Sequence, residues 1–454
     1  MRTCLAIFLL LGALQLLFPV TAKCQNIATE KVALGLKDES LEVAIKKIEQ
    51  QTTLRFFYHN GDVTPLAHLN LITGSRTIQQ TLEVLLQNTN LSFRQMGNNI
   101  LLERREQPAF YEISGRVADS ADRSAVANAS VFINNSTVGC TTDSNGSFKL
   151  NITTPGKYEI VVSIIGYGNY KKALFIDNNI ALPTIVIASR TVKLSEVKVT
   201  TDPNWDRNFK LFNQEFLGRW NFPGKCVILN PEVLDLNYDE KTGVLTASSP
   251  YFLEIENEAL GYKLKYLLTK FSSSKKSGKV TYKGSVWFEN LTGDQGWQQL
   301  WQRNRNKAYK GSMMHFLRAA LENQLAAEGF EVLRLKRLDF NEDNSVKYIE
   351  TLGKTYLQAD DFVKLTNKRD VYALSFKDRL YVMYTKIHNY KGNLATIPLG
   401  YQPSYAKTSL VMVSPYTFFD NNGIIMNPES IAFEGYWADS RVAEILPSDY
   451  SPDN

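Results

Sequence analysis

The chain has 454 residues, of which 44% are hydrophobic and 21% charged, and its formal net charge is +5. This composition is ordinary for globular protein and excludes disorder as the default state, while the length predicts two to four domains. The charge is small for this size and no block of Lys and Arg stands out, so nucleic acid is not an expected partner.

The first residues have the pattern of a secretory signal. Met1–Thr3 carries a positive charge, Leu5–Val20 is an almost uninterrupted apolar run, and Val20–Ala22 supplies small residues for cleavage. Because the run is too short to span a membrane, we expect residues 1–22 to be removed during export. The predicted location is the periplasm or the outer membrane.

Cysteine is sparse, and one of the four cysteines, Cys4, lies in the leader. A lipoprotein signal ending at Cys24 is an alternative, but Lys23 is a poor match for the small residue that lipid attachment needs before the cysteine. Cys140 and Cys226 could form a disulfide in an oxidising compartment. Their irregular spacing favours free buried thiols instead.

Residues 31–102 contain one pattern twice, at an offset of 37 residues. Each copy predicts strand, helix and strand, with Ser40 and Thr77 as the helix N-caps. Two such half-buried units must pack together to close a core. The matching positions are Leu34, Leu41, Ala44, Ile45, Ile48, Thr52, Leu54 and Phe56 in the first copy, and Leu71, Ile78, Thr81, Leu82, Leu85, Thr89, Leu91 and Phe93 in the second.

This repeat, together with the closing hairpin sequence Gly97–Leu102, resembles the short N-terminal domain of secretins and TonB-dependent receptors. In that family the domain is periplasmic and docks onto partner proteins, in some receptors a transmembrane signalling regulator. The resemblance therefore implies an envelope protein partner for residues 23–106. It supplies no catalytic residue.

Ile113–Val199 is a run of short strands separated by turns at Asn145-Gly146 and Pro155-Gly156, typical of antiparallel sheet. It resembles the carboxypeptidase regulatory-like domain, a transthyretin-like β-sandwich, and we assign it residues 110–200. Asp143 and Asn145 could suggest calcium, but the further carboxylates of a calcium loop are missing. Turn chemistry is the preferred interpretation of both residues.

A peptidase activity is not expected from this resemblance. The chain has four histidines, His59, His68, His315 and His388, and none begins a His-x-x-Glu or His-Glu-x-x-His motif. The nucleophile motif Gly-x-Ser-x-Gly is also missing. We therefore expect no catalytic zinc, no other cofactor and no enzymatic activity.

Leu194–Val199 is similar to the segment that leads into the plug and barrel of outer-membrane nutrient receptors. About 250 residues follow it, far short of a transporter barrel of about 22 strands. We therefore do not expect an importer of this kind.

Residues 206–454 are predicted to form a third domain of α+β class, mostly antiparallel sheet. A short amphipathic helix covers 206–217, and two-residue alternation through 262–269 and 280–288 predicts strands. A hairpin is predicted from 371–376 and 380–385. One long helix is expected to be capped by Ser312, to bury Met314, Leu317, Leu321 and Leu325, and to end at Gly329.

Aromatic and basic residues in this domain suggest a ligand surface. The candidate contacts are Trp297, Trp301, Arg303, Arg305, His315 and Arg318. Aromatic faces stack on sugars and Arg binds carboxylates, so a glycan or peptide groove is one hypothesis. The alternative, which we favour, is that the aromatic residues fill a core and the basic residues cover a helix.

The leading functional hypothesis is a non-enzymatic envelope protein with docking modules and a C-terminal domain that binds a partner or polymer. One rival is an envelope hydrolase acting on glycan or peptide, with carboxylates such as Glu254, Glu256 or Asp294 paired in a cleft. A second rival is a structural spacer.

Overall fold

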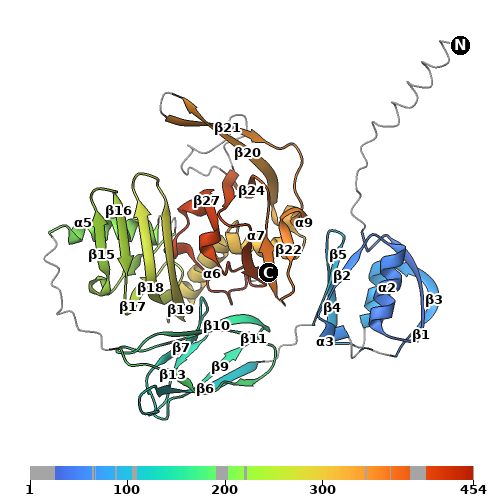
Figure 1. The fold of residues 1–454 in the computed structure, drawn as a ribbon, viewed down its shortest axis with the longest axis horizontal. Helices are drawn as coiled ribbons and strands as arrows, with labels where there is room; N and C mark the ends of the chain where they lie inside the picture. The colour runs from blue at the N-terminus through green and yellow to red at the C-terminus, as the bar shows by residue number, and fades with distance from the viewer. Residues whose placement is uncertain are drawn as a thin grey trace. The chain divides into compact units, whose positions relative to one another are not determined.

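The computed structural model describes residues 26–452, except 64–65, 67, 87–88, 105–109, 191–202, 219–221, 343–344, 369 and 389–404 (Figure 1). The leader with Cys4, and Cys24 just after the leader, therefore lie outside the described residues. The chain divides into two compact units, residues 1–105 and 106–454. Each unit mixes strands and helices, which confirms the α+β class. No helix in the described part of the chain is both long and apolar enough to cross a membrane.

The N-terminal unit contains the predicted repeat of strand, helix and strand. Its elements are β1 (Lys31–Glu39), α2 (Leu41–Gln51), β2 (Arg55–Phe57), α3 (Asn60–Val63), β3 (Leu69–Thr77), α4 (Ile78–Leu86), β4 (Leu91–Met96) and β5 (Asn99–Arg104). Strands β1 and β3 form an antiparallel pair, and β2, β5 and β4 form a three-stranded sheet. Both copies contribute to one core, for example Ile45 and Ile48 from α2 and Leu82 from α4.

Both predicted N-caps are present. Ser40 Oγ accepts a hydrogen bond from the Val43 N–H, at 3.4 Å. Thr77 Oγ1 accepts from the Gln80 N–H at 3.1 Å, while Gln80 Oε1 accepts from the Thr77 N–H at 3.2 Å. These bonds satisfy amide groups that the first helical turn leaves without partners.

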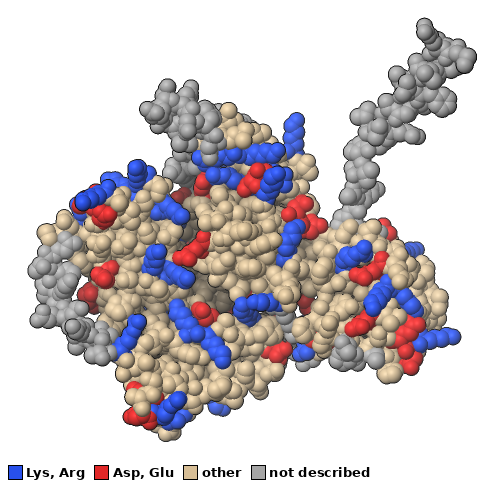
Figure 2. All heavy atoms as spheres, viewed as in Figure 1, with Lys and Arg blue, Asp and Glu red and all other residues tan. Residues whose placement is uncertain are grey.

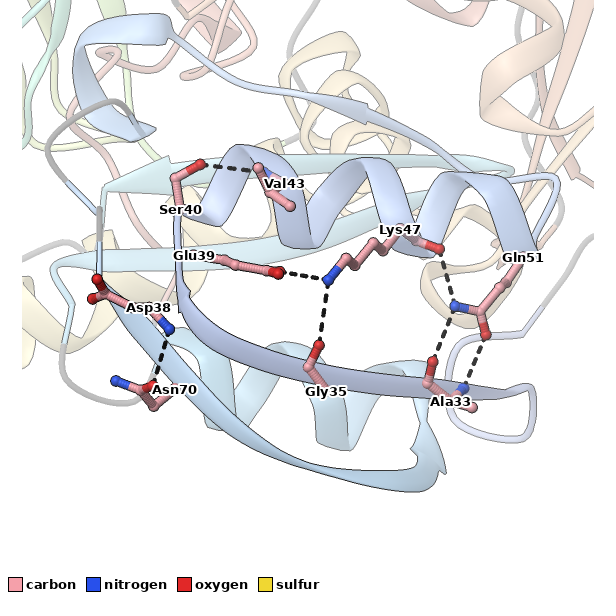
Figure 3. A network of polar contacts seen from close by, with 9 residues as sticks. All are labelled: Ala33, Gly35, Asp38, Glu39, Ser40, Val43, Lys47, Gln51 and Asn70. Atoms are coloured by element: carbon pink, nitrogen blue, oxygen red, sulfur yellow. Dashed lines mark hydrogen bonds and ion pairs between the residues drawn. The ribbon is translucent and has the colours of Figure 1, made fainter.

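Side chains of α2 close the outer edge of β1 (Figure 3). Gln51 pairs with the backbone of Ala33 in both directions, accepting its N–H at 3.0 Å and donating to its carbonyl at 3.1 Å. The Lys47 ammonium donates to the Gly35 carbonyl at 3.4 Å and forms an ion pair with Glu39. Three backbone groups on this edge of β1 are therefore occupied by side chains of α2 and are not available to another strand.

The C-terminal unit begins with the predicted sandwich. Its strands are β6 (Tyr111–Asp119), β7 (Ser130–Ile133), β8 (Gly139–Thr141), β9 (Ser147–Ile152), β10 (Gly156–Ser163), β11 (Tyr170–Ile176), β12 (Ile180–Ala181) and β13 (Ile185–Ile187). One sheet has the order β11-β10-β7-β8, and in the other β6 pairs with β9, β12 and β13. The core between them includes Ile113, Val131 and Ile160.

The prediction of antiparallel strands is wrong in one respect, because β6 pairs in parallel with both β12 and β13. The turn at Asn145-Gly146 is confirmed as turn chemistry. Asp143 Oδ1 accepts hydrogen bonds from the N–H groups of Asn145 and Ser147, at 2.9 and 2.7 Å. Gly146 has φ of 72°, a left-handed value that favours glycine.

A six-stranded sheet follows the sandwich. Its elements are α5 (Trp205–Leu217), β14 (Cys226–Ile228), the 3₁₀ turn η1 (Pro231–Val233), β15 (Asp235–Asp239), β16 (Val244–Ser248), β17 (Phe252–Asn257), β18 (Tyr262–Ser274) and β19 (Val280–Asn290). The predicted amphipathic helix and the alternating strand are confirmed, since Phe212 and Phe216 of α5 pack with Tyr266 and Leu268 of β18 in one core.

A second, five-stranded sheet has the order β21-β20-β24-β25-β27, and β22, β23 and β26 form a smaller one. Helices α6 and α7 lie between the six-stranded and five-stranded sheets (Figure 1). The remaining elements are α6 (Gln295–Tyr309), α7 (Met313–Leu321), α8 (Leu325–Glu328), β20 (Phe330–Glu342), β21 (Ser345–Leu352), α9 (Ala359–Phe362), β22 (Val363–Leu365), β23 (Val371–Leu374), β24 (Arg379–His388), β25 (Tyr405–Met412), β26 (Thr417–Asp420), η3 (Pro428–Ser430), β27 (Ile431–Gly435), α10 (Tyr436–Asp439) and η4 (Val442–Glu444).

Two local predictions are wrong. The expected hairpin does not form, because β23 pairs with β22 and β26 while β24 joins the other sheet. The Ser375 N–H donates to the Phe362 carbonyl at 2.9 Å, which continues the pairing of β23 with β22 by one more position. The expected long helix is two helices, α7 and α8, separated at Asn323, which has φ of 55°. Its predicted ends, the Ser312 cap and Gly329, are confirmed.

The sandwich and the six-stranded sheet share a seam. Phe132 and Val161 of the sandwich pack on Leu267 and Trp287 of the sheet, and the Phe132 and Trp287 rings stack with centroids 5.9 Å apart. The loop 134–137 adds backbone pairing. The Asn135 N–H donates to the Val286 carbonyl at 2.8 Å, and the Phe288 N–H donates to the Ser136 carbonyl at 3.0 Å.

Both described cysteines are free. Cys226 is buried, and burial raises the pKa of its thiol to about 12. Cys140 is half-buried. The alternative of a bridge between them is therefore not realised in the structure.

Candidate functional site

Helix α6 is hydrogen-bonded to the turn between β17 and β18. Trp301, Asn304 and Arg305 donate hydrogen bonds to the carbonyl oxygens of residues 258–261, at distances between 2.7 and 3.0 Å. Positions 301, 304 and 305 lie on one helical face, so a single turn of helix reaches successive carbonyl groups. The Arg305 guanidinium also lies 3.9 Å from the centroid of the Tyr262 ring.

Arg318 on α7 holds together segments that are distant in sequence. Its guanidinium donates to the carbonyl oxygens of Asn422, Ser448 and Tyr450, at 2.9, 2.9 and 2.8 Å. The fork of donors on one arginine suits three separate acceptors. This side chain is therefore already satisfied by the protein's own backbone.

His315 is buried in an aromatic environment that includes Tyr309 and Phe330. The Gly311 N–H donates to its Nδ1 at 3.0 Å, and its Nε2 lies 3.1 Å from a carboxylate oxygen of Glu328. Burial lowers the pKa of His315, with Glu328 acting in the opposite direction. The imidazole links α7 to α8 and is not on an open surface.

The six predicted contact residues therefore fall into two groups, four that make internal contacts and two that are exposed. Trp301, Arg305, His315 and Arg318 make the internal contacts described above. Trp297, with 43% of its surface exposed, and Arg303 face solvent on α6. A ligand role at these two positions stays a prediction.

The carboxylates of the hydrolase hypothesis have structural partners. Glu254 forms an ion pair with Lys263 at 2.7 Å. Asp294 caps α6, accepting a hydrogen bond from the Trp297 N–H at 3.0 Å. Glu256 lies on the same strand as Glu254, opposite Lys263 in the strand register. None of the three lines the recess described next.

An open recess lies where α6, α7, β27, α10 and η4 meet. Its empty space, counted with the open mouth, is about 520 Å³. The residues that line it are mostly apolar or aromatic, with a few polar groups, as in small-molecule sites. They are Phe222, Lys307, Ala308, Ser312, Met313, Phe433, Tyr436, Trp437, Ser440 and Glu444.

Trp437 is a fixed wall of this recess. Its indole N–H donates to the Gly311 carbonyl at 2.7 Å, and its ring packs against Phe316, with centroids 5.3 Å apart, and against Phe433, at 6.0 Å. A buried indole with its N–H bonded has little freedom to move. The recess is therefore preformed on this side.

Glu444 is the acidic group of the recess. Burial raises the pKa of its carboxyl to about 7, the hydrogen bond from Ser440 opposes the rise, and the nearby Asp439 adds to it. Burial also raises the pKa of the neighbouring Tyr436 to about 12. Perturbed carboxyl groups in a concave site mark functional candidates. Among the described residues, no group of three or more His, Cys, Asp or Glu side chains is placed to hold a metal ion.

The sequence did not predict the recess because its residues come from three separate stretches of the chain: position 222, positions 307–313 and positions 433–444. The aromatic pair Tyr436-Trp437, eight residues before Glu444, was the one local signal. The distribution of surface charge does not indicate a binding site either. Figure 2 shows Lys and Arg scattered over the visible face with Asp and Glu between them.

The carboxypeptidase regulatory-like resemblance is confirmed, because the family model of the CarboxypepD_reg-like domain matches residues 113–199. No curated protein matches the chain.

Parts of the chain are similar to three solved structures of low identity. A cohesin–X-dockerin complex from Acetivibrio cellulolyticus is 21% identical over 17% of this chain and 58% of that chain, with a TM-score of 0.17. The shaft pilin SpaA from Lactobacillus rhamnosus GG is 18% identical over 21% and 54%, with a TM-score of 0.16. The minor pilin GBS52 from Streptococcus agalactiae is 14% identical over 23% and 55%, with a TM-score of 0.19. This chain spans little more than half of each, and such TM-scores carry no conclusion about function.

Proposed function

We propose that the protein is a non-enzymatic component of the cell envelope, exported by the leader 1–22 to the periplasm or the outer membrane. Residues 23–106 dock on an envelope protein, as the resemblance to the secretin and TonB-receptor N-terminal domain implies. The sandwich, residues 110–200, supports the β-rich domain of residues 206–454, which binds a partner or ligand.

The surface of the N-terminal unit is the observation that carries the docking role. Ile72 is 85% exposed, Val84 47% and Phe57 40%, although the unit has a complete core of its own. We propose these side chains as candidate partner contacts, because burying exposed apolar surface stabilises an interface. The closed edge of β1 disfavours partner binding by strand addition there and favours side-chain contacts.

The sandwich has a supporting role in this proposal because its β7–β10 face is occupied by the seam. Phe132 and Val161 are fully buried against the six-stranded sheet. That face is not available to another protein. The recess beside Glu444 is the ligand site that we propose for the C-terminal unit.

The docking role is tested by cross-linking the full-length protein in envelope extracts. The variants Ile72→Glu and Val84→Glu place a charge on the N-terminal unit without touching its core, and Val413→Glu, at a position 56% exposed in the C-terminal unit, is the matched control. We expect the first two to lose the cross-linked partner and the control to keep it. Equal recovery with all three variants would refute docking through this surface.

A further inference from the structure

The lining of the recess suits a ligand that has a cationic group and an apolar body. Three of its walls are the aromatic side chains of Phe433, Tyr436 and Trp437, and Met313 and Phe222 add apolar surface. Aromatic faces attract ammonium groups, most strongly for Trp and when water is excluded. The apolar remainder of the lining favours a ligand with a hydrocarbon part.

Glu444 supplies a negative charge to the recess. Among the described residues, those that act on its carboxyl, in addition to burial, are Ser440 and Asp439, and no Lys, Arg or His is among them. A half-buried carboxylate without a cationic partner is costly, and a bound cation removes that cost.

Lys307 on α6 is the only basic residue among those that line the recess, and its side chain is exposed. It makes an anionic ligand the rival class. Glu444 is the more buried of the two groups, so its field is screened less by water. The charge of Glu444 therefore outweighs that of Lys307 in the recess and favours a positively charged ligand group.

Given the ligand-binding role proposed above for the C-terminal unit, we propose that this recess binds the ammonium group of a small amine with an apolar body. The ammonium lies between Glu444 and the aromatic walls, and the hydrocarbon part covers the apolar lining.

The test is isothermal titration calorimetry on the full-length protein at pH 8 with three matched probes: phenethylamine, 2-phenylethanol and 3-phenylpropionate. We expect the amine to bind at least tenfold more tightly than the alcohol. Glu444→Gln should remove that difference, while Glu429→Gln, which neutralises an exposed carboxylate in η3, should preserve it. Thermal unfolding of each variant checks that it is folded.

Acidification is a second readout. Ionised Glu444 is the form that attracts an ammonium, so amine binding should weaken as the pH falls from 8 to 5.5, while alcohol binding stays constant. Phenethylamine remains protonated in this range, as a lysine amine does. The other titratable groups that line the recess are Tyr436 and Lys307, and the charge of Asp439 acts on the Glu444 carboxyl.

Each other result overturns the assignment in its own way. Equal binding of amine and alcohol would remove the cation role and leave the recess as an apolar site. Preference for the propionate, lost in Lys307→Gln, would make Lys307 the recognising charge. If none of the probes binds, the recess is not the ligand site. The cross-linking experiment on the N-terminal unit is unaffected by any of these results.

Discussion

Arg303 and Arg305 lie two positions apart on α6 and have different surroundings. Arg303 is exposed, whereas Arg305 donates to two backbone carbonyl groups and lies over the ring of Tyr262. Residue type alone could not distinguish them, because the acceptors of Arg305 are more than forty positions away in the chain. Charge was therefore a weak guide to ligand contacts here.

This pair gives a matched test of stability. We expect Arg305→Ala to lower the free energy of unfolding by about 2–4 kcal/mol, since buried carbonyl groups lose a charged donor. Arg303→Ala should change it by less than about 0.5 kcal/mol. Denaturant unfolding of both variants measures the difference, and equal effects would contradict the tie between α6 and the turn 258–261.

Asp420 gives a prediction for pH dependence. Burial raises the pKa of its carboxyl to about 6, although the N–H groups of Ile424 and Asn422 and the charge of Arg318 lower it. Between the ordinary value of 3.8 and this pKa, the folded protein holds a proton that the unfolded chain has released. Stability from this group is therefore fully present below pH 3.8, falls as the pH rises to about 6, and is constant above.

Asp420→Asn keeps an oxygen for the two N–H groups and removes the ionisation. We expect the variant to gain up to about 3 kcal/mol on the wild type between pH 4 and pH 7, because one unit of pKa corresponds to about 1.4 kcal/mol. The measurement is the difference in unfolding free energy across that range. A difference that does not vary with pH would show that Asp420 does not titrate in this way.

At the scale of elements, Gly139 on β8 lies directly against the indole of Trp287. A Cβ added there would come within 2.3 Å of the ring. Gly139→Ala should therefore destabilise the C-terminal unit by about 1–3 kcal/mol through overpacking at the seam. Gly168→Ala, where the nearest atom is 3.8 Å away, is the control and should be nearly neutral in thermal unfolding.

The spacing of apolar residues predicted the helices and strands better than it predicted which strands pair with each other. The stripe of α5 and the alternation of β18 are local patterns, and both were correct because burial of one face fixes them. The same alternation in 371–385 indicated two strands but not their partners, since a period of two identifies the buried face and not the adjacent strand. The helix break at Asn323 also escaped detection, because leucines continue the helical spacing across it.

The candidate recess lay beyond sequence reasoning for a related reason. Lys307, Phe433, Trp437 and Glu444 come from α6, β27, α10 and η4 and line the same recess. Each residue has an unremarkable local context. Only the tertiary structure reveals that a carboxylate and several aromatic rings share one concave surface.

At the scale of the whole molecule, the division into two units predicts the unfolding behaviour. We expect calorimetry to show two transitions, one for each unit, and no separate transition for the sandwich. Ile48→Ala, in the core of the N-terminal unit, should lower the melting temperature of that unit's transition alone. Phe132→Ala, in the seam, should lower only the melting temperature of the C-terminal unit. Each substitution should cost about 2–5 kcal/mol. A third transition that moves with Phe132→Ala alone would contradict the shared seam.

The seam is also closed by residues from the far end of the chain. The Ser448 N–H donates to the Asn135 carbonyl at 2.6 Å, and the Thr137 N–H donates to Asp449 at 3.0 Å. Some three hundred positions of chain separate these partners, so the sandwich leaves the ribosome or translocon long before the turn at Ser448 and Asp449 that contacts it. Maturation of the unit is consequently a late event, and a nascent chain halted upstream of 448 should remain sensitive to proteases at the 134–137 loop.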